Sequence, residues 1–412
     1  MTVGDAAYRA TQRAGLLRFA AGSRHDAGFG HLDDEGRLDP AMPAELYVTC
    51  RMTHVFAMGL LGGETPAPGG PDAEALRGLV QHGVDALLDG PLHDRENGGW
   101  FSRVNPDGSV AALKEAYGHA HAVLAASSAK AAGVDRAGEL LDRALAVQND
   151  RFWDEAAGLV VEEWDPAWTE LSQYRGMNST MHTVECYLAA GDVTSDRMWY
   201  RRAGRMAARL VGWAGNNGWR IPEHFTADWE PLLEYNRDQP AHPFRPYGAT
   251  VGHGLEWARL LVQTDASLGD EAPAGLREAG ASLAERAIAD GWHADGADGF
   301  VYTTDWEGRP IVQARMHWVL CEAAATSEVL RQLTGDPRHA ADLQRWWDYA
   351  DRYLVDRERG SWHHELGPEN RPQAQTWAGK PDAYHTYQAL WIQDLPVVPS
   401  FASAIRDGVG TG

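Results

Sequence analysis

The feature that most constrains the fold of this chain is an internal repeat. A glycine-containing turn with aromatic or β-branched neighbours recurs along the 412 residues. The six turns, spaced by 59 to 81 residues, are centred on Gly30, Gly99, Gly158, Gly218, Gly299 and Gly360. Pairs of segments with helical spacing of apolar residues lie between the turns, as expected of a repeated helical hairpin. Such a chain folds as an open solenoid or as a closed ring.

Each repeat joins two kinds of helical segment. The first kind is more charged, which is typical of helices with one face in solvent. We expect these helices over residues 5–22, 72–90, 134–150, 192–214, 270–291 and 336–355. The second kind is rich in small and apolar residues but carries one polar or aromatic anchor. The anchors recur every 65 to 71 residues, at Arg51, Tyr117, His182, His253, Trp318 and His385. This regularity predicts six inner helices that line one level of a shared interior.

Two features favour a closed ring over an open solenoid. The inner helices carry ionisable and aromatic residues among small ones, which is typical of a cavity wall, and neither end of the chain shows a polar capping repeat. We therefore expect an all-α fold, an (α/α)6 barrel, in which six helical hairpins form a toroid with short β-hairpins at the helix ends. Residues 1–400 are predicted to form a single domain, and residues 401–412 a flexible tail.

Charge and composition narrow the possible partners. The chain has 37 Lys and Arg against 58 Asp and Glu, a formal charge of −21, which argues against a nucleic-acid or membrane partner. No apolar run approaches the roughly 20 residues of a membrane span, and the N-terminus lacks a signal-peptide pattern. Three widely separated cysteines, Cys50, Cys186 and Cys321, fit a reducing compartment, so we expect a cytoplasmic protein. The charged outer helices show no apolar seam from which an oligomeric state could be predicted.

Two inner helices carry histidines suited to proton transfer. In DAYHTYQALW, Asp382 can cap the helix, which places His385 in the first turn, where the helix dipole favours a neutral imidazole. In GATVGHGLEWARLL, His253 and Glu256 share a face, so the carboxylate can orient the imidazole or bind a substrate hydroxyl. A neutral imidazole can act as a general base near pH 7. We therefore predict His253 and His385 as a catalytic pair.

Other inner-helix faces carry lines of polar residues. They comprise Asn178, His182 and Glu185 on one helix, Tyr47, Arg51 and His54 on a second, and Tyr117, His121 and Trp318 on two more. A lone histidine or arginine on a helix is most often structural, but recurrence at one phase of a repeat favours a functional role. Arg51 also interrupts an otherwise apolar helix, and a cavity is the simplest reason for that.

The polar residues come without a metal or cofactor motif. His317, His363 and His364 form short clusters, but the HExxH pattern and Cys/His ligand spacings are missing. The Gly- and Pro-rich stretch at 63–71 lacks the strand and the GK[ST] sequence of a phosphate-binding loop. We therefore predict a site that uses no metal and no cofactor.

Four separated motifs resemble those of the N-acylglucosamine 2-epimerase superfamily. They are RMTH at 51–54, NSTMHTVE at 178–185, HPFRPYGATVGHGLEWARLL at 242–261 and GKPDAYHTYQALW at 379–391. The motifs occur in order over nearly the whole chain, and the likeness is strongest to the aldose–ketose isomerase branch. The resemblance implies an (α/α)6 barrel, no cofactor, and two catalytic histidines at the positions of His253 and His385.

The reaction implied by the resemblance is proton transfer beside a sugar carbonyl. The implied substrate contacts are Arg51, Tyr117, Asn178, His182, Glu256, Trp318 and Trp377. We expect His253 to assist ring opening and His385 to remove the C2 proton, which gives a cis-enediolate. Arg51 and a protonated His182 or His253 would stabilise its negative charge. Return of the proton to C1 gives a ketose, whereas return to the opposite face of C2 gives the epimer.

The substrate expected from the resemblance is a small monosaccharide. Substrates of this branch include D-mannose and sulfoquinovose, and the negative net charge mildly disfavours an anionic sugar. We therefore expect conversion of D-mannose to D-fructose, with D-lyxose as a poorer substrate that gives D-xylulose. Sulfoquinovose isomerisation, for which Arg237 and Arg245 could bind the sulfonate, stays open as an alternative. So does 2-epimerisation, such as that of cellobiose.

Two hypotheses from other classes also stay open. An inverting glycoside hydrolase could use Glu256 with Glu185 or Asp382, if the two carboxyl groups lie about 6.5 to 9.5 Å apart. A non-catalytic sugar-binding toroid would tolerate loss of the histidines. The recurrence of histidines at the inner level favours the isomerase, because a hydrolase of this kind needs two carboxylic acids.

Overall fold

Helices dominate the computed structural model, which describes residues 2–408. The outer helices are α1 (Ala6–Ala20), α3 (Ala73–Asp89), α5 (Ala137–Val147), α7 (Arg197–Asn216), α9 (Leu276–Gly291) and α11 (Pro337–Tyr349). The inner helices are α2 (Leu46–Gly62), α4 (Ala116–Ala131), α6 (Met177–Thr194), α8 (Val251–Leu268), α10 (His317–Thr334) and α12 (Tyr384–Trp391). Within the described residues, these two sets of six confirm the predicted repeat, with boundaries a few residues from the expected ones.

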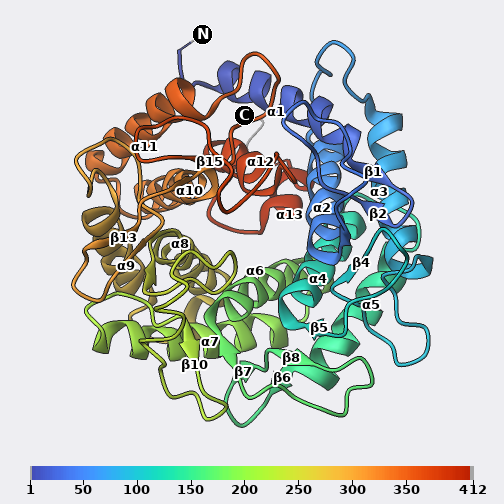
Figure 1. Cartoon of the computed structure of the whole chain (residues 1–412), viewed down its shortest axis with the longest axis horizontal. Helices are drawn as coiled ribbons and strands as arrows, with labels where there is room; N and C mark the ends of the chain where they lie inside the picture. The colour runs from blue at the N-terminus through green and yellow to red at the C-terminus, as the bar shows by residue number, and fades with distance from the viewer. Residues whose placement is uncertain (1, 409–412) are drawn as a thin grey trace.

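The inner helices form a closed ring. Each packs against its neighbour along the chain, and α12 returns to pack against α2. Each outer helix packs against an inner one, and α1 covers α12, so the two ends of the chain complete one hairpin. Figure 1 shows the ring viewed along its axis, with α2, α4, α6, α8, α10 and α12 around the centre. The predicted toroid is therefore confirmed.

The two helix sets differ in how they begin and what they bury. Four outer helices start at an aspartate whose side chain accepts a hydrogen bond from a backbone N–H of the first turn: Asp5, Asp72, Asp196 and Asp336. The inner helices have no such side-chain cap, and most of their side chains are buried on every face. Small residues, as in AYGHAHAVLAASSAKA of α4, let neighbouring helices approach closely. In residues 2–408, no helix is both long and apolar enough to cross a membrane.

Short strands connect neighbouring repeats. The pairs are β1 (Arg24–His25) with β2 (Gly28–Phe29), β3 (Ala44–Glu45) with β4 (Arg103–Val104), β5 (Lys114–Glu115) with β8 (Glu163–Trp164), β6 (Trp153–Asp154) with β7 (Leu159–Val160), β9 (Arg175–Gly176) with β10 (His224–Phe225), β11 (Ala249–Thr250) with β12 (Thr303–Thr304), β12 with β13 (Pro310–Val312), and β14 (Arg315–Met316) with β15 (Glu365–Leu366). The prediction of local β-hairpins holds for only three pairs in the described chain. Five pairs instead join the strand before an inner helix to the following repeat, because that neighbour supplies the unpaired backbone edge.

The end of the chain corrects another expectation. Residues 401–412 were predicted to be flexible, but Phe401–Arg406 form helix α13. This helix packs against α2, α4 and α6, and its residues Phe401 to Ala404 are buried. In Figure 1 it lies near the centre of the ring. Apolar burial at one end of the barrel offsets the entropy that would otherwise leave a short polar tail disordered. Residues 409–412 lie outside the described part of the chain.

Candidate active site

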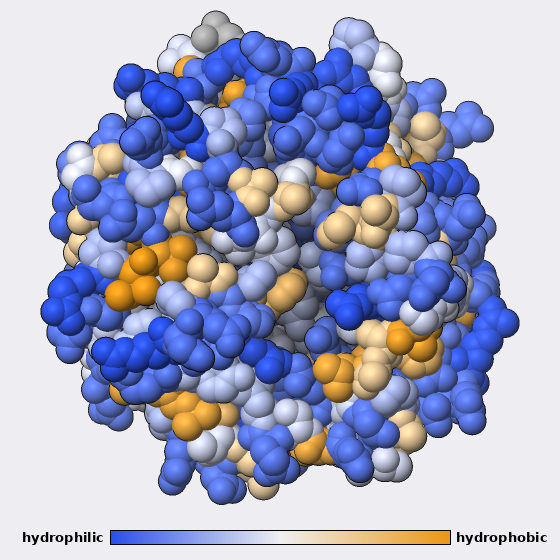
Figure 2. All heavy atoms as spheres, in the orientation of Figure 1, coloured by the Kyte–Doolittle hydropathy of each residue, from blue (hydrophilic) through white to orange (hydrophobic). Residues whose placement is uncertain are grey.

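A cavity of about 730 Å³, which includes space open to solvent, lies inside the ring. Figure 2 shows that the face seen in Figure 1 is hollowed near its centre. All nine of the predicted site residues line the cavity: Arg51, Tyr117, Asn178, His182, His253, Glu256, Trp318, Trp377 and His385. The six anchors of the repeat are among them, so they do share one interior space.

The first turns of the inner helices supply much of the cavity wall. Tyr47, Tyr117, Asn178, Trp318 and His385 are each the second residue of their helix, in α2, α4, α6, α10 and α12. The N-termini of these helices therefore converge on the cavity. The dipole of a helix favours negative charge at its N-terminus. This end of the barrel is suited to stabilise an anion that forms during a reaction.

Each candidate catalytic histidine is oriented by a buried carboxylate. His253 Nδ1 lies 2.9 and 3.0 Å from the two carboxylate oxygens of Glu223. His385 Nδ1 lies 2.9 Å from Oε1 of Glu322. Because a carboxylate only accepts, both histidines donate from Nδ1, and Nε2 is the nitrogen available to a ligand. This is the arrangement of an oriented acid–base imidazole.

Neither Glu223 nor Glu322 was among the predicted site residues. Glu322 lies four residues after the anchor Trp318 on a buried helix, so the pattern that identified Glu256 could also have found it. Glu223 is harder to find, because it lies in a loop before β10, and only the packing of that loop against α8 brings it to His253.

Trp318 lies between the two histidines. Its ring centroid is 5.5 Å from that of His253 and 5.6 Å from that of His385. A glycine at position 252 permits this placement, since a Cβ there would lie 2.2 Å from the Trp318 ring. The indole thus offers a flat apolar surface between two polar groups, which suits the C–H face of a sugar.

Arg51 is held by three neighbours on the opposite wall. Its guanidinium donates to the Tyr117 hydroxyl at 2.8 Å, to Asp382 at 3.3 Å and to His121 Nε2 at 3.0 Å. His121 donates from Nδ1 to the backbone carbonyl of Tyr117, so it is a neutral imidazole that positions Arg51. Burial alone would raise the pKa of Asp382, but the charge of Arg51 keeps it well below its usual value. Arg51 and Asp382 therefore form a buried ion pair at the cavity wall.

The first turn of α12 differs from the expectation. His385 does lie in that turn, but the helix begins after Ala383 without a side-chain cap. Asp382 accepts a hydrogen bond from the backbone N–H of Tyr384 and pairs with Arg51 instead. The pKa of His385 is lowered chiefly by burial, while the hydrogen bond to Glu322 acts in the opposite direction. Burial thus favours the neutral form of this imidazole.

His182 also differs from the expectation of a protonated donor. Burial lowers its pKa to about 4, so the imidazole is neutral near pH 7. Its Nδ1 lies 3.6 Å from Glu185 and 3.8 Å from Glu256, which is too long for a hydrogen bond. A neutral His182 can still donate one hydrogen bond to a ligand.

Several cavity residues were not predicted to be functional. His317 and His364 stack with ring centroids 3.8 Å apart, and both line the cavity. Phe244 packs edge-on against Trp377 at 5.2 Å at the cavity wall. The paired histidines at 317 and 364 were visible in the sequence, but without ligand spacing nothing distinguished them from structural residues.

Other residues that the sequence analysis singled out are not among those that line the cavity. His54 is buried between Ser128 and Gln388, and Glu185 accepts hydrogen bonds from Tyr384 and Gln388. Arg245 pairs with Glu163, and the exposed Arg237 pairs with Glu234. Neither arginine is among the residues that line this cavity, but Arg245 lines an adjoining cavity that shares Tyr117 and Asn178 with it.

Within residues 2–408, two groups of side chains are close enough to be considered for metal binding. They are His182, Glu185 and Glu256, and Glu256, Glu322 and His385. In the first group Glu185 already accepts from Tyr384 and Gln388, and in the second Glu322 already accepts from His385 and Arg259. The Arg259 guanidinium lies 3.8 Å from Glu256, and its positive charge opposes a cation. The donor set therefore does not favour a metal ion.

Comparisons with known proteins agree with this geometry. The family model described as N-acylglucosamine 2-epimerase (GlcNAc 2-epimerase) matches residues 27–389. A D-mannose isomerase of Thermobifida fusca is 49% identical over 95% of this chain and 94% of the relative. A D-mannose isomerase of Pseudomonas cannabina pv. alisalensis is 43% identical over 95% and 92%. A crystal structure of D-mannose isomerase superposes with a TM-score of 0.86 at 23% identity, covering 95% of this chain and 98% of that one.

The family match extends from the turn before α2 into α12, and so includes every inner helix. The structural match shows the same fold over nearly the full length of both chains. Together with the identity to the two relatives, these matches lead to one assignment. The chain belongs to the N-acylglucosamine 2-epimerase family.

Proposed function

We propose that this protein is a cofactor-independent aldose–ketose isomerase that interconverts D-mannose and D-fructose. The observation that carries the proposal is the pair of buried imidazoles, His253 and His385, on either side of Trp318. Each is oriented through Nδ1 by its own carboxylate, so each presents Nε2 to a sugar-sized cavity. Two positioned imidazoles provide the base and the acid that enediolate chemistry needs.

His385 is the proposed base at carbon. In the open-chain aldose, its Nε2 removes the C2 proton, and the C–H electron pair forms the C1–C2 double bond while the C1 carbonyl oxygen takes up negative charge. The same proton then returns from His385 to C1, and the C2 hydroxyl loses its proton as the C2 carbonyl forms. The sum is a ketose, with every atom of the aldose retained.

His253 is the proposed acid and base at oxygen. It first assists opening of the pyranose ring and then moves the proton between the C2 and C1 oxygens. Both oxygens of Glu223 face its Nδ1, which stabilises the imidazolium that forms when Nε2 accepts a proton. The Arg51 guanidinium and the converging helix N-termini supply positive potential for the enediolate.

Three observations support D-mannose over an anionic sugar. The two relatives that share 49% and 43% of their residues with this chain are named for that substrate. Arg51 is the one Lys or Arg among the described residues that line the cavity, and Asp382 neutralises it. Arg237 and Arg245 are engaged elsewhere. We expect D-lyxose to react more slowly, giving D-xylulose, and sulfoquinovose to react poorly.

The inverting hydrolase receives less support from the geometry. Oxygens of Glu185 and Glu256 lie within 4.8 Å of each other, which leaves no room for the attacking water of an inverting mechanism. Asp382, the other candidate, is ion-paired with Arg51. Sugar 2-epimerisation is a closer alternative, because it requires only that a proton return to the opposite face of C2.

Product analysis tests the proposal. The purified protein is incubated with D-mannose, D-lyxose, D-glucose, cellobiose or sulfoquinovose, with and without EDTA, and the sugars are resolved by chromatography. We expect D-fructose from D-mannose at the same rate with EDTA, and slower conversion of D-lyxose. Glucose as the first product from mannose would indicate epimerisation instead. No conversion of D-mannose, or conversion abolished by EDTA, would contradict the proposal.

A further inference from the structure

Three buried glutamates surround a single arginine beside the cavity. Glu185, Glu256 and Glu322 come from α6, α8 and α10, and Arg259 lies one turn after Glu256 on α8. The Arg259 guanidinium is 3.1 Å from Glu322, 3.8 Å from Glu256 and 4.0 Å from Glu185. All four side chains are at least nine-tenths buried. One positive charge therefore faces three acidic groups in a medium that strengthens their repulsion.

Two of the three carboxyl groups have the hydrogen bonds that a buried anion needs. Glu185 accepts from the Tyr384 hydroxyl and from Gln388 Nε2. Glu322 accepts from His385 Nδ1 through one oxygen and from Arg259 Nε through the other. In each case both oxygens have a donor, so these two groups are suited to be carboxylates.

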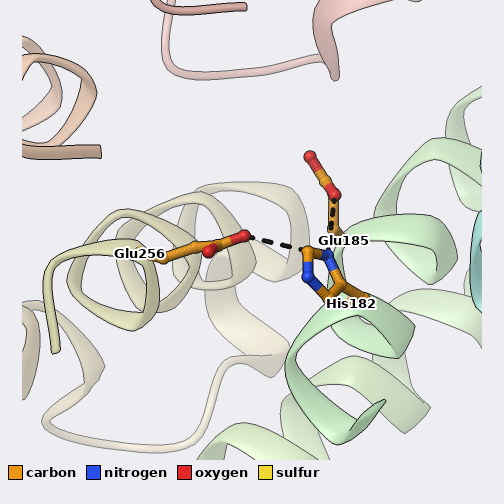
Figure 3. Close-up of side chains that lie close together, drawn as sticks. All are labelled: His182, Glu185 and Glu256. Carbon is orange, nitrogen blue, oxygen red and sulfur yellow. Dashed lines mark ion pairs between the residues drawn. The ribbon is translucent and has the colours of Figure 1, made fainter. Parts of the chain in front are cut away.

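Glu256 has no such donors. Both of its oxygens are buried and have no hydrogen-bond partner among the described residues, and the residue is only 1% exposed. Figure 3 shows its carboxyl group pointing toward the ring of His182, and Glu185 approaches the same edge of that ring, near Nδ1. His182 Nδ1 is 3.8 Å away, and that imidazole is neutral. An isolated buried carboxylate is costly, and binding a proton removes the cost.

The charged and titratable groups around Glu256 also favour its protonated form. They are Arg51 of α2, Tyr117 of α4, His182 and Glu185 of α6, Arg259 of α8, Glu322 of α10, and Tyr384 and His385 of α12. Arg51 is neutralised by Asp382, and Arg259 is closest to Glu322. Burial first, and then the charge of Glu322, raise the pKa of Glu256 well above its usual value. Arg259 and Arg51 oppose this effect without cancelling it.

We propose that Glu256 is a neutral carboxylic acid at neutral pH and that its O–H group donates a hydrogen bond to an oxygen of the sugar. The inference rests on the proposed function, because Glu256 lines the cavity that would hold the sugar. A third negative charge beside the enediolate would oppose its formation. A carboxylic acid kept neutral by burial instead supplies a donor to a developing oxyanion. The proton stays on Glu256 throughout, so the step adds no proton to the reaction.

Substitution by glutamine tests this protonation state. The side-chain amide has the shape of a neutral carboxylic acid and can donate, so Glu256→Gln should keep kcat for D-mannose within about tenfold of the original chain. Glu256→Ala removes the donor and should lose about 100- to 1,000-fold. The matched control is Glu322→Gln, which removes a true carboxylate and should be much more damaging than Glu256→Gln. A Glu256→Gln variant as impaired as Glu256→Ala would overturn the proposal.

Infrared spectroscopy provides a second readout that does not depend on activity. The original protein at pH 7 should show the C=O stretching band of a protonated carboxylic acid, shifted in D2O and missing from Glu256→Gln. No such band, or a band unchanged in Glu256→Gln, would also overturn the proposal. If the protein did not isomerise D-mannose, the proposed function would fail, yet the infrared result would still decide the protonation of Glu256.

A third readout is the alkaline limb of the pH profile. As pH rises through the pKa of Glu256, the group becomes an anion and ceases to donate, so kcat/KM of the original protein should fall. The Glu256→Gln variant cannot ionise and should lack this part of the decline. An alkaline limb that is identical in the two proteins contradicts the donor role.

Discussion

The two His–Glu pairs look alike locally but differ in what surrounds the carboxylate. Glu223 directs both oxygens at His253. Glu322 divides its oxygens between His385 and Arg259. A carboxylate shared with a guanidinium stabilises an imidazolium less than one that serves the histidine alone. The comparison teaches that one scaffold can use the same residue pair twice and give the two imidazoles different electrostatic surroundings, which supports the different roles proposed for them.

The positions of the two glutamates in the fold explain why, in the described chain, Glu322 also binds an arginine and Glu223 binds only its histidine. Glu322 lies on α10 within the barrel wall, where Arg259 of the neighbouring inner helix can reach it. Glu223 lies in a loop before β10, and within residues 2–408 its ion pair is with His253 and not with an arginine. We therefore assign proton transfer at carbon to His385 and proton transfer at oxygen to His253.

The largest expected effect comes from removing either imidazole. His385→Ala and His253→Ala should each lower kcat for D-mannose by about 100- to 10,000-fold, because each removes one acid–base group. The two variants should differ in the isotope effect measured with mannose deuterated at C2. C–H cleavage limits the rate in His385→Ala, so the effect should be large, whereas slow ring opening in His253→Ala should suppress it.

Circular dichroism and thermal melting serve as the control for folding of these variants. Equal isotope effects in the two variants would remove the distinction between their roles. Near-normal turnover by either one would contradict its place in the mechanism.

A smaller effect is expected from neutralising the orienting carboxylates. Glu223→Gln and Glu322→Gln should each lower kcat by about 100-fold, since the imidazole loses its electrostatic partner while remaining in place. The aspartate variants are matched controls that keep the charge, and they should recover part of the lost activity if the carboxylate acts electrostatically.

The pH dependence of kcat/KM should distinguish Glu322→Gln from Glu223→Gln. Activity requires neutral His385 and falls as pH drops through its pKa, which burial places below the usual 6.5. Glu322 raises that pKa, so Glu322→Gln should move the acid limb of kcat/KM to still lower pH. Glu223→Gln should leave this limb in place. A shift of the limb to higher pH in Glu322→Gln would contradict the sign of the interaction.

The smallest expected effect concerns the indole between the two pairs. Gly252→Ala would place a Cβ within 2.2 Å of the Trp318 ring and displace it. We expect a loss of about 1–3 kcal/mol in the free energy of unfolding, because the site is already filled. The KM for D-mannose should rise more than kcat falls, since Trp318 forms a binding surface and transfers no proton.

Gly212→Ala on α7 is the matched control, because a Cβ there meets no atom within 4 Å. It should be neutral or slightly stabilising, since alanine favours a helix. If the two substitutions had equal effects on KM, Trp318 would not be positioned by Gly252.

Much of the fold could be predicted because it follows from local periodicity. Anchors at regular spacing, such as Tyr117 and His253, predicted six inner helices, and the charged segments predicted the outer ones. The strand pairings could not be predicted in the same way. Strand β5 pairs with β8 of the next repeat, and no pattern within either two-residue strand specifies that partner. Helix α13 was missed because its stability comes from burial against the barrel.

In the candidate site, too, some features follow from local sequence and others depend on tertiary packing. The sequence alone determined the repeat and the inner level of polar anchors, which includes His253 and His385, because helical spacing places such residues on one face. Only the tertiary structure decided which carboxylate faces which imidazole, that His121 serves Arg51, and that Glu256 is left without a donor. These relations join residues from different helices, and their energies depend on burial and on distances of a few ångströms, which a linear pattern of residues does not contain.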